Sequence, residues 1–167
     1  MCHPPAFLLE KRKEGTMFLN TDFLRTDEIF LKLDHTVDPS QAGRADWLPA
    51  YHFSICLPDG AEAGACDLRI GHNESVYYGG NIGYRVYPEH RGRHYAGKAC
   101  LLLFELARRH GMEYLYITCN PENAASRKTC EFAGGALEDI VSLPPDNDMY
   151  LEGERCKCIY KFSLLLP

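Results

Sequence analysis

The sequence predicts one domain of mixed α/β (α+β) class. Short runs rich in β-branched and aromatic residues recur along the chain between turn signals, which is typical of strands. Between residues 82 and 119 one such run is followed by an amphipathic helix and then by another run. Because a strand–helix–strand unit closes as a right-handed crossover, the two strands are predicted to lie parallel.

The size and composition of the chain are those of a soluble globular protein. Its 167 residues suit a single domain, 1–167, with residues 1–16 as a loosely attached lead-in. The net charge of −5 disfavours a general nucleic-acid partner. No apolar run approaches the ~20 residues of a membrane span, and the start of the chain has no signal-peptide layout. We therefore expect a cytoplasmic protein with no membrane partner.

The first half of the chain is predicted to be mainly strands. Residues 17–26 favour a strand, and residues 27–33 favour a helix that begins at Asp27, with an extended segment as the alternative. Residues 36–48 indicate a loop or a short irregular helix. The turn Pro58-Asp59-Gly60 separates strands at 51–57 and 63–70 and predicts a hairpin. Residues 71–81 indicate a further turn region, followed by a strand at 82–86.

The second half is organised around an amphipathic helix that ends before Gly111. Apolar residues recur along this helix with helical spacing and predict a buried stripe of Ala99, Leu102, Leu103, Leu106 and Ala107. Strands are expected at 114–119, 136–143 and 156–164, the last in a hairpin. A short helix is expected at 124–132, and a surface loop at 144–148.

The segment from Val86 to Ala99 carries the main functional signal. A strand ends at Pro88, a turn rich in Arg and Gly follows, and the long helix begins at once. This order places free backbone N–H groups at a helix N-terminus, flanked by cations. The segment therefore predicts an anion site, most naturally for a phosphate or pyrophosphate.

The eight cysteines allow a disulfide framework or a metal-binding regulator as alternatives. Nothing indicates secretion, and Cys156-Lys157-Cys158 is a C-x-C pair with no matching second pair. Most of the cysteines lie among apolar residues, for example Cys66 and Cys119. We expect them to be small buried hydrophobic residues, and we expect no metal site.

The order of these elements resembles the GNAT superfamily of acetyl-CoA-dependent N-acetyltransferases, from about residue 17 to the end. The family's phosphate motif is Q/R-x-x-G-x-G/A, and Arg91 and Ala96 fill its first and last places. His94 stands where the family has Gly. In the later family pattern, Asn123 and Ser126 match, whereas Cys130 stands where a Tyr is usual.

The resemblance implies a mixed central sheet of about six to seven strands, with helices on both faces and a splayed pair of parallel strands. It implies acetyl-CoA as the cosubstrate and direct acetyl transfer to a primary amine of a small molecule or a peptide. The alternative is a module on the same fold that binds or senses CoA with weak or lost catalysis. The implied cofactor-binding residues are Arg85, Val86, Tyr87, Arg91, Gly92, Arg93, His94, Tyr95, Ala96, Gly97, Asn123 and Ser126.

Acyl transfer also needs a proton donor for the leaving thiolate and a base for the amine. Cys130, in the place of the family's Tyr, is the candidate donor, with an inert buried Cys or a water donor as alternatives. The remaining hydroxyl candidates are Tyr84, Tyr87 and Tyr95. Glu89 is the candidate base. The alternatives are a water relay or one of Asp67, His72, Glu138 and Asp139.

The acceptor is not identified by the sequence. The acidic residues of the 143–156 loop could attract a cationic amine; they are Asp146, Asp148, Glu152 and Glu154. The oligomeric state is open, with a homodimer among the options.

Overall fold

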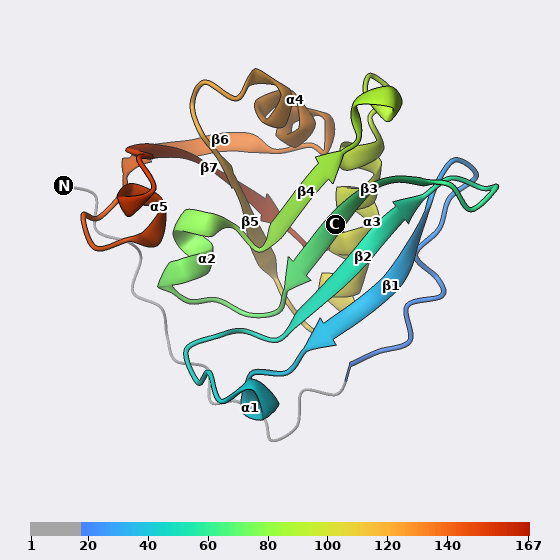
Figure 1. Cartoon of the computed structure of the whole chain (residues 1–167), viewed down its shortest axis with the longest axis horizontal. Helices are drawn as coiled ribbons and strands as arrows, with labels where there is room; N and C mark the ends of the chain where they lie inside the picture. The colour runs from blue at the N-terminus through green and yellow to red at the C-terminus, as the bar shows by residue number, and fades with distance from the viewer. Residues whose placement is uncertain (1–17) are drawn as a thin grey trace.

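The computed structural model describes residues 18–167, so the expected lead-in at residues 1–16 lies outside the described residues. Two antiparallel sheets form the centre of the fold (Figure 1). The first sheet has the order β1-β2-β3-β4, with bounds Phe30–Val37, Ala50–Cys56, Glu62–Arg69 and Ile82–Val86. The second has the order β5-β7-β6, with β5 at Tyr114–Cys119, β6 at Ala136–Ser142 and β7 at Cys156–Ser163.

One long helix, α3, covers one face of the four-stranded sheet and leaves the other face open. In Figure 1 it lies behind the sheet, whereas the short helices α1 and α2 lie beyond the ends of the strands. The helices are α1 (Pro39–Ala42), α2 (Glu74–Gly79), α3 (Tyr95–Arg109), α4 (Ala124–Phe132) and α5 (Asp148–Leu151), with a 3₁₀ turn η1 at Pro88–His90.

The stripe predicted on α3 forms the centre of the core. Ala99, Leu103, Leu106 and Ala107 are completely buried, and Leu102 packs against the same cluster while partly buried. Full burial of a Leu side chain contributes about 1.5–3 kcal/mol. These contacts hold α3, and therefore its N-terminus, at a fixed position against the sheet.

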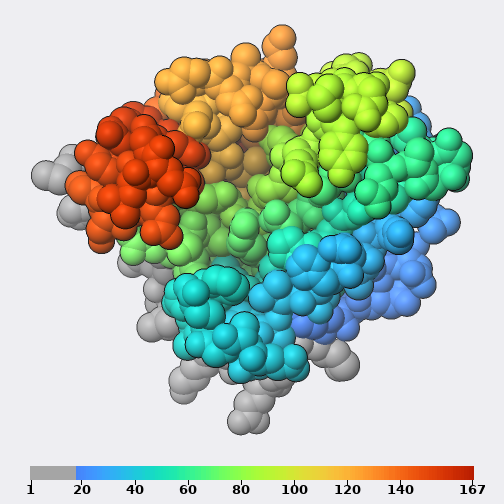
Figure 2. All heavy atoms as spheres, in the orientation of Figure 1, coloured from blue at the N-terminus to red at the C-terminus, as the bar shows by residue number. Residues whose placement is uncertain are grey.

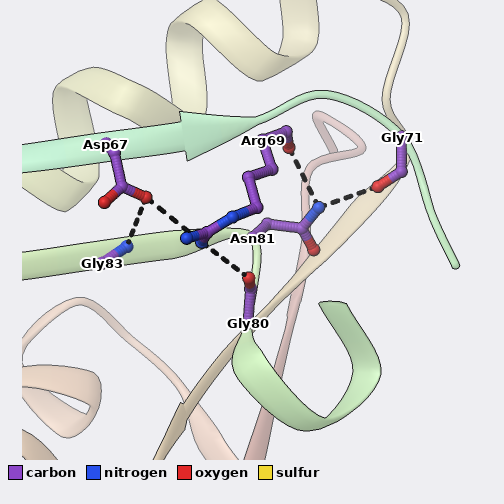
Figure 3. A network of polar contacts seen from close by, with 6 residues as sticks. All are labelled: Asp67, Arg69, Gly71, Gly80, Asn81 and Gly83. Carbon is purple, nitrogen blue, oxygen red and sulfur yellow. Dashed lines mark hydrogen bonds and ion pairs between the residues drawn. The ribbon is translucent and has the colours of Figure 1, made fainter. Parts of the chain in front are cut away.

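The two sheets meet where β4 and β5 begin to diverge. Asn81, completely buried, donates its backbone N–H to the Tyr116 carbonyl (2.7 Å), and its Oδ1 accepts from the Tyr116 N–H (2.9 Å). Its Nδ2 donates to the carbonyls of Arg69 and Gly71 (Figure 3). The predicted mixed α+β fold is therefore confirmed. The strands form two hydrogen-bonded sheets, and the division between them falls between β4 and β5.

Most elements form where the sequence predicts them, but the N-terminal part differs. The described part of the predicted strand at 17–26 forms turns, with one isolated bridge between Arg25 and Phe30. The helix favoured at 27–33 is wrong, because β1 begins at Phe30 and pairs with β2. That segment buries Ile29 and Leu31 in alternation, and a neighbouring strand satisfies its backbone.

Two short helices occur where turns and loops are predicted. α2 lies within 71–81, where Asn73 caps it by accepting from the Val76 N–H (3.0 Å). Its residues Tyr77 and Tyr78 pack with Tyr116 of the second sheet. α5 lies at the end of the predicted 144–148 loop. Both helices are shorter than a sequence period can reveal, so packing rather than pattern determines them.

Most of the cysteines in the described part of the chain are buried, as the sequence predicts. Six of the seven within residues 18–167 are buried, Cys156 is half-buried, and none of the seven is in a disulfide. Over the same residues, no group of three or more His, Cys, Asp or Glu side chains is arranged to hold a metal ion. No helix in this part of the chain is long and apolar enough to cross a membrane.

Candidate active site

The N-terminus of α3 has free backbone donors. The first helical hydrogen bond joins the Lys98 N–H to the His94 carbonyl (2.9 Å), so the N–H groups of Tyr95, Ala96 and Gly97 precede it. The side chain of the capping residue His94 satisfies none of them. The partial positive charge of a helix N-terminus adds to these donors, and the exposed Arg91 and Arg93 lie in the turn before it. These free donors and cations are what an anion site requires, and the binding of an anion here stays a prediction.

His94 adopts a left-handed backbone conformation, with φ of 59° and ψ of 26°. Gly reaches this conformation at no steric cost, which explains why a small residue is usual at this place, while His tolerates it better than most residues. The imidazole turns toward α4 and stacks on Phe132, with ring centroids 4.5 Å apart and an angle of 6°. Phe132 also packs against Gly97, where an added Cβ would lie 2.3 Å from Cδ1 of the ring.

The edge of β4 that faces β5 also presents backbone donors. The Tyr87 N–H bonds to the Ala63 carbonyl (2.9 Å), and the Arg69 N–H bonds to the Asn81 carbonyl (2.8 Å). In an antiparallel pair the hydrogen-bonding groups alternate along the strand. The N–H groups of Tyr84 and Val86 therefore point into the gap between β4 and β5. The Val86 carbonyl accepts from Arg91 Nε (3.1 Å), which ties the turn to the strand end.

A pair of hydroxyl groups lies between β4 and α4. The Tyr84 hydroxyl is 2.7 Å from Ser126 Oγ and 4.0 Å from Cys130 Sγ. Ser126 lies in the first turn of α4, where its N–H donates to Oδ1 of the capping residue Asn123 (3.0 Å). Burial raises the pKa of Tyr84, so this hydroxyl keeps its proton at neutral pH.

Cys130 faces the core. Its side chain is completely buried, and burial raises the pKa of its thiol to about 12. Cys100 and Cys119 belong to the same core cluster. This placement disfavours the proton-donor role and favours the inert alternative, in which Cys130 fills space beside Tyr84.

The candidate bases are dispersed, and Asp67 lies against β4. Its Oδ1 accepts from the Gly83 N–H (3.3 Å) and pairs with Arg69 Nη1 (3.2 Å) (Figure 3). Glu89 is exposed in the η1 turn, beyond the end of β4. His72 stacks on Tyr114, at a centroid distance of 4.0 Å. Glu138 and Asp139 lie on β6 of the other sheet.

The open face of the four-stranded sheet holds His35 and His52, which the sequence did not single out for catalysis, together with the candidate base Asp67. A groove of about 510 Å³ runs over it and is lined by side chains that include His35, His52, Asp67 and Arg85. The signal was the alternation in β2, which places His52 on the face opposite the buried Tyr51 and Phe53. Figure 2 looks onto this side, with a hollow between α4 (orange), the turn before α3 (yellow-green) and α5 (red).

The acidic residues of the 143–156 loop lie around α5. Glu154 pairs with Lys157 of β7, so its charge is used within the fold. Asp146, Asp148 and Glu152 are exposed. Their attraction for a cationic amine stays a prediction.

In this α+β fold, free backbone N–H groups lie at the start of α3 and along the edge of β4 that faces β5. Such an arrangement suits a protein that binds an anionic cofactor with an extended arm. A family model described as an acetyltransferase (GNAT) domain matches residues 20–136, and the chain belongs to this family. GNAT acetyltransferases use acetyl-CoA. No curated protein sequence gives a significant match.

Solved structures show the same fold. The microcin C7 self-immunity acetyltransferase MccE, in complex with acetyl-CoA and AMP, has a TM-score of 0.56 and 20% identity over 75% of this chain and 64% of its own. The Vibrio cholerae spermidine N-acetyltransferase, in complex with CoA and spermine, has a TM-score of 0.53 and 14% identity over 69% of this chain and 66% of its own. The Vibrio fischeri ribosomal-protein-S5-alanine acetyltransferase has a TM-score of 0.55 and 14% identity over 74% of this chain and 66% of its own. The matched region spans less than two thirds of each of these chains.

Two orphaned polar atoms test whether the residues of this chain fit acetyl-CoA. His90 Nδ1, in the turn before α3, and Asn120 Oδ1, just after β5, are buried without a hydrogen-bond partner in the described part of the chain. Both lie at the ends of elements that border the gap. Together with the free N–H groups of α3 and β4, they give the polar partners that a phosphorylated, amide-containing arm needs. The residues therefore fit the cofactor.

Proposed function

We propose that this protein transfers the acetyl group of acetyl-CoA directly to a primary amine of a small molecule or a peptide. The observation that carries the proposal is the convergence of the free N–H groups of α3 with those of Tyr84 and Val86 at one gap. Amine acetylation is supported by two structural neighbours, a spermidine N-acetyltransferase and a ribosomal-protein-S5-alanine acetyltransferase.

Each wall of the gap has its own role in this proposal. The N–H groups of Tyr95 to Gly97, with Arg91 and Arg93, bind the pyrophosphate. The backbone of residues 85–87 pairs with the arm as a further strand would. Acetyl-CoA supplies the acetyl thioester, whose carbonyl oxygen needs a donor in the transition state. The N–H groups of Tyr84 and Val86 are the donors that face the gap.

We assign proton donation to the hydroxyl pair Tyr84–Ser126 in preference to Cys130. Ser126 is half-buried and bonded to a tyrosine that stays protonated, whereas Cys130 is completely buried. A relay from Tyr84 through Ser126 can protonate a thiolate without exposing the core. No contact of the exposed Glu89 supports its assignment as the base, and a water relay remains an alternative for this role.

The test is acetyl-CoA turnover with a panel of amines, read by release of free thiol. The panel contains spermidine, lysine and a peptide with a free N-terminal alanine. We expect turnover with at least one amine, and a kcat for Tyr84→Phe that is lower by roughly 10–100-fold. Cys130→Ala is the matched control and keeps kcat within about twofold, because its sulfur faces the core. Equal kcat values for Tyr84→Phe and wild type would remove Tyr84 from the mechanism.

The second candidate is a module that binds or senses CoA with weak catalysis. The burial of Cys130, in the place of the family's tyrosine, favours it. Tight acetyl-CoA binding by calorimetry, together with no thiol release for any amine, would identify the module.

We also propose that the chain works as a single domain in the cytoplasm. The free state of the seven described cysteines supports a reducing compartment. Light scattering at several concentrations distinguishes a monomer from the homodimer that the family resemblance leaves open.

A further inference from the structure

The groove on the open face meets the strand proposed to hold the cofactor. It is lined by Gly83, Tyr84 and Arg85 of β4, by Tyr87 just after this strand, and by residues of β1, β2 and β3. Because α3 occupies the opposite face of this sheet, a second substrate can approach β4 from the groove. The groove therefore lies beside the N–H groups that face the gap, at the level of Tyr84.

Asp67 is seated directly on β4 within this groove. It pairs with Gly83 in the strand register, and its Oδ2 and Oδ1 lie 2.9 and 3.3 Å from where a Gly83 Cβ would be. Gly83 thus leaves the space that the carboxylate occupies, and Arg69 and the Gly83 N–H hold the carboxylate there. The result is a carboxylate held in a fixed position against β4, one residue along the strand from Tyr84, with Arg69 as its ion-pair partner.

His52 lies next to Asp67 on the same face. The two residues are direct cross-strand partners, so their Cβ atoms are about 4.5–5.5 Å apart. On its other side His52 stacks on His35, with centroids 4.4 Å apart, and His35 bonds to Asp34 (2.7 Å). Burial lowers the pKa of His52, as do His35 and Arg69, while Asp67 and Asp34 act in the opposite direction. His52 is therefore neutral at pH 7 and can accept a proton.

We propose that this groove is the acceptor site for a cationic primary amine, in which Asp67 binds the ammonium group and His52 takes its proton. The inference rests on the proposed acetyltransferase function and names the acceptor half of that site. The lining of the groove also includes Arg85 and Glu62, which add one positive and one negative charge.

The proposed transfer balances as follows. The ammonium loses one proton to the His52 imidazole, which later releases it to solvent. The freed nitrogen lone pair forms a C–N bond to the acetyl carbon, and the C–S bond breaks. The second proton leaves the nitrogen and ends on the thiolate, so the products are the amide and free CoA.

The experiment compares wild type, His52→Gln, Asp67→Asn and the control Glu113→Gln, which removes an exposed carboxylate just before β5 of the other sheet. Each is assayed at saturating acetyl-CoA from about pH 5 to pH 9, with spermidine and with the alanine peptide as separate arms. Calorimetry with acetyl-CoA and thermal unfolding are run on every variant. The faster arm tells whether the amine comes from a polyamine or a polypeptide.

We expect His52→Gln to lower kcat by about 100-fold and to abolish the fall in kcat on the acid side of the pH profile. Asp67→Asn should raise the KM for the amine by about tenfold or more, because the variant loses the ion pair between the carboxylate and the ammonium group, and a tenfold change in affinity corresponds to a modest ion pair. Neither variant should change acetyl-CoA affinity. Glu113→Gln should match wild type in every measurement.

A wild-type kcat and pH profile in His52→Gln would overturn the assignment of His52, and an unchanged amine KM in Asp67→Asn would overturn the assignment of the groove. If His52→Gln unfolds, His52→Ala with added imidazole replaces it, since rescue by imidazole requires proton transfer and its failure counts against the proposal. Wild-type protein that binds acetyl-CoA and acetylates no amine would instead refute the proposed function, and this inference with it.

Discussion

Phe132 shows how single residues tie the two helices of the cofactor wall together. Its ring stacks on His94 and also packs against Gly97. His94 forms the turn and Gly97 lies in the first turn of α3, so both contacts bear on the free N–H groups. The ring of α4 therefore supports the proposed pyrophosphate site without contacting a ligand.

Gly97→Ala tests this contact. A methyl group at Gly97 would meet the Phe132 ring at 2.3 Å, so we expect the free energy of unfolding to fall by about 1–3 kcal/mol. Urea denaturation measures the change. Gly79→Ala is the control, because nothing lies within 4 Å of its added Cβ. A combined Gly97→Ala/Phe132→Ala variant that loses no more than Phe132→Ala alone would support the clash, and additive losses would contradict it.

The sequence could identify His94 as a departure, but it could not show where the ring goes. The partner, Phe132, lies on another helix, and a stacking contact leaves no periodic signal. The same holds for Asp67 and His52, which β-strand register brings together. The sequence could predict a site whose residues lie within one turn, such as the free N–H groups before α3. It could not predict contacts between residues on different helices or strands.

At the level of elements, the junction from β4 through η1 to α3 carries the cofactor prediction. Ala96 lies beside the free N–H groups and is 8% exposed. Ala96→Glu places a carboxylate at the helix N-terminus, where it can occupy the donors that an anion would use. We expect the Kd for acetyl-CoA to rise by at least about tenfold, equivalent to about 1.4 kcal/mol. Calorimetry provides the measurement.

Leu101→Glu is the matched control for that experiment. Leu101 lies on the same helix and is 47% exposed, so the same charge is added to α3 away from its N-terminus. Its acetyl-CoA affinity should equal that of wild type. Unchanged affinity in folded Ala96→Glu would mean that the anion site lies elsewhere.

The elements that were predicted correctly have strong local signals. α3 has a long apolar period and Gly111 after its end, and the β2–β3 hairpin has a Pro-Asp-Gly turn. The segment at 27–33 has a competing helix-start signal at Asp27, which pairing with β2 overrides. The short α2 depends on burial of Val76 and its two neighbouring tyrosines, which a sequence window cannot reveal.

At the level of the whole molecule, the core contains several groups that must stay protonated. Burial raises the pKa values of Cys66, Cys100, Cys130 and Tyr84. The folded state therefore holds more protons than the unfolded state at alkaline pH. The stability that these groups provide is complete below the unfolded pKa values, about 8.5 for Cys and 10 for Tyr, and is lost as pH rises above them.

We expect the free energy of unfolding to fall by roughly 1–2 kcal/mol per buried thiol between about pH 8 and pH 10. Urea denaturation in the presence of a reductant measures it. Cys130→Ala removes one of the titrating groups and should make the fall shallower. An identical pH dependence in wild type and Cys130→Ala would contradict the burial argument for this thiol.

The five hydrogen bonds of Asn81 have a consequence for binding. They connect the backbone of both sheets at the point where β4 and β5 separate. The opening between the strands is thus formed during folding, and its conformational entropy is lost at that stage rather than when a ligand arrives. A preorganised opening of this kind loses little affinity to ordering, so cofactor binding should leave amide hydrogen exchange at the base of β4 nearly unchanged.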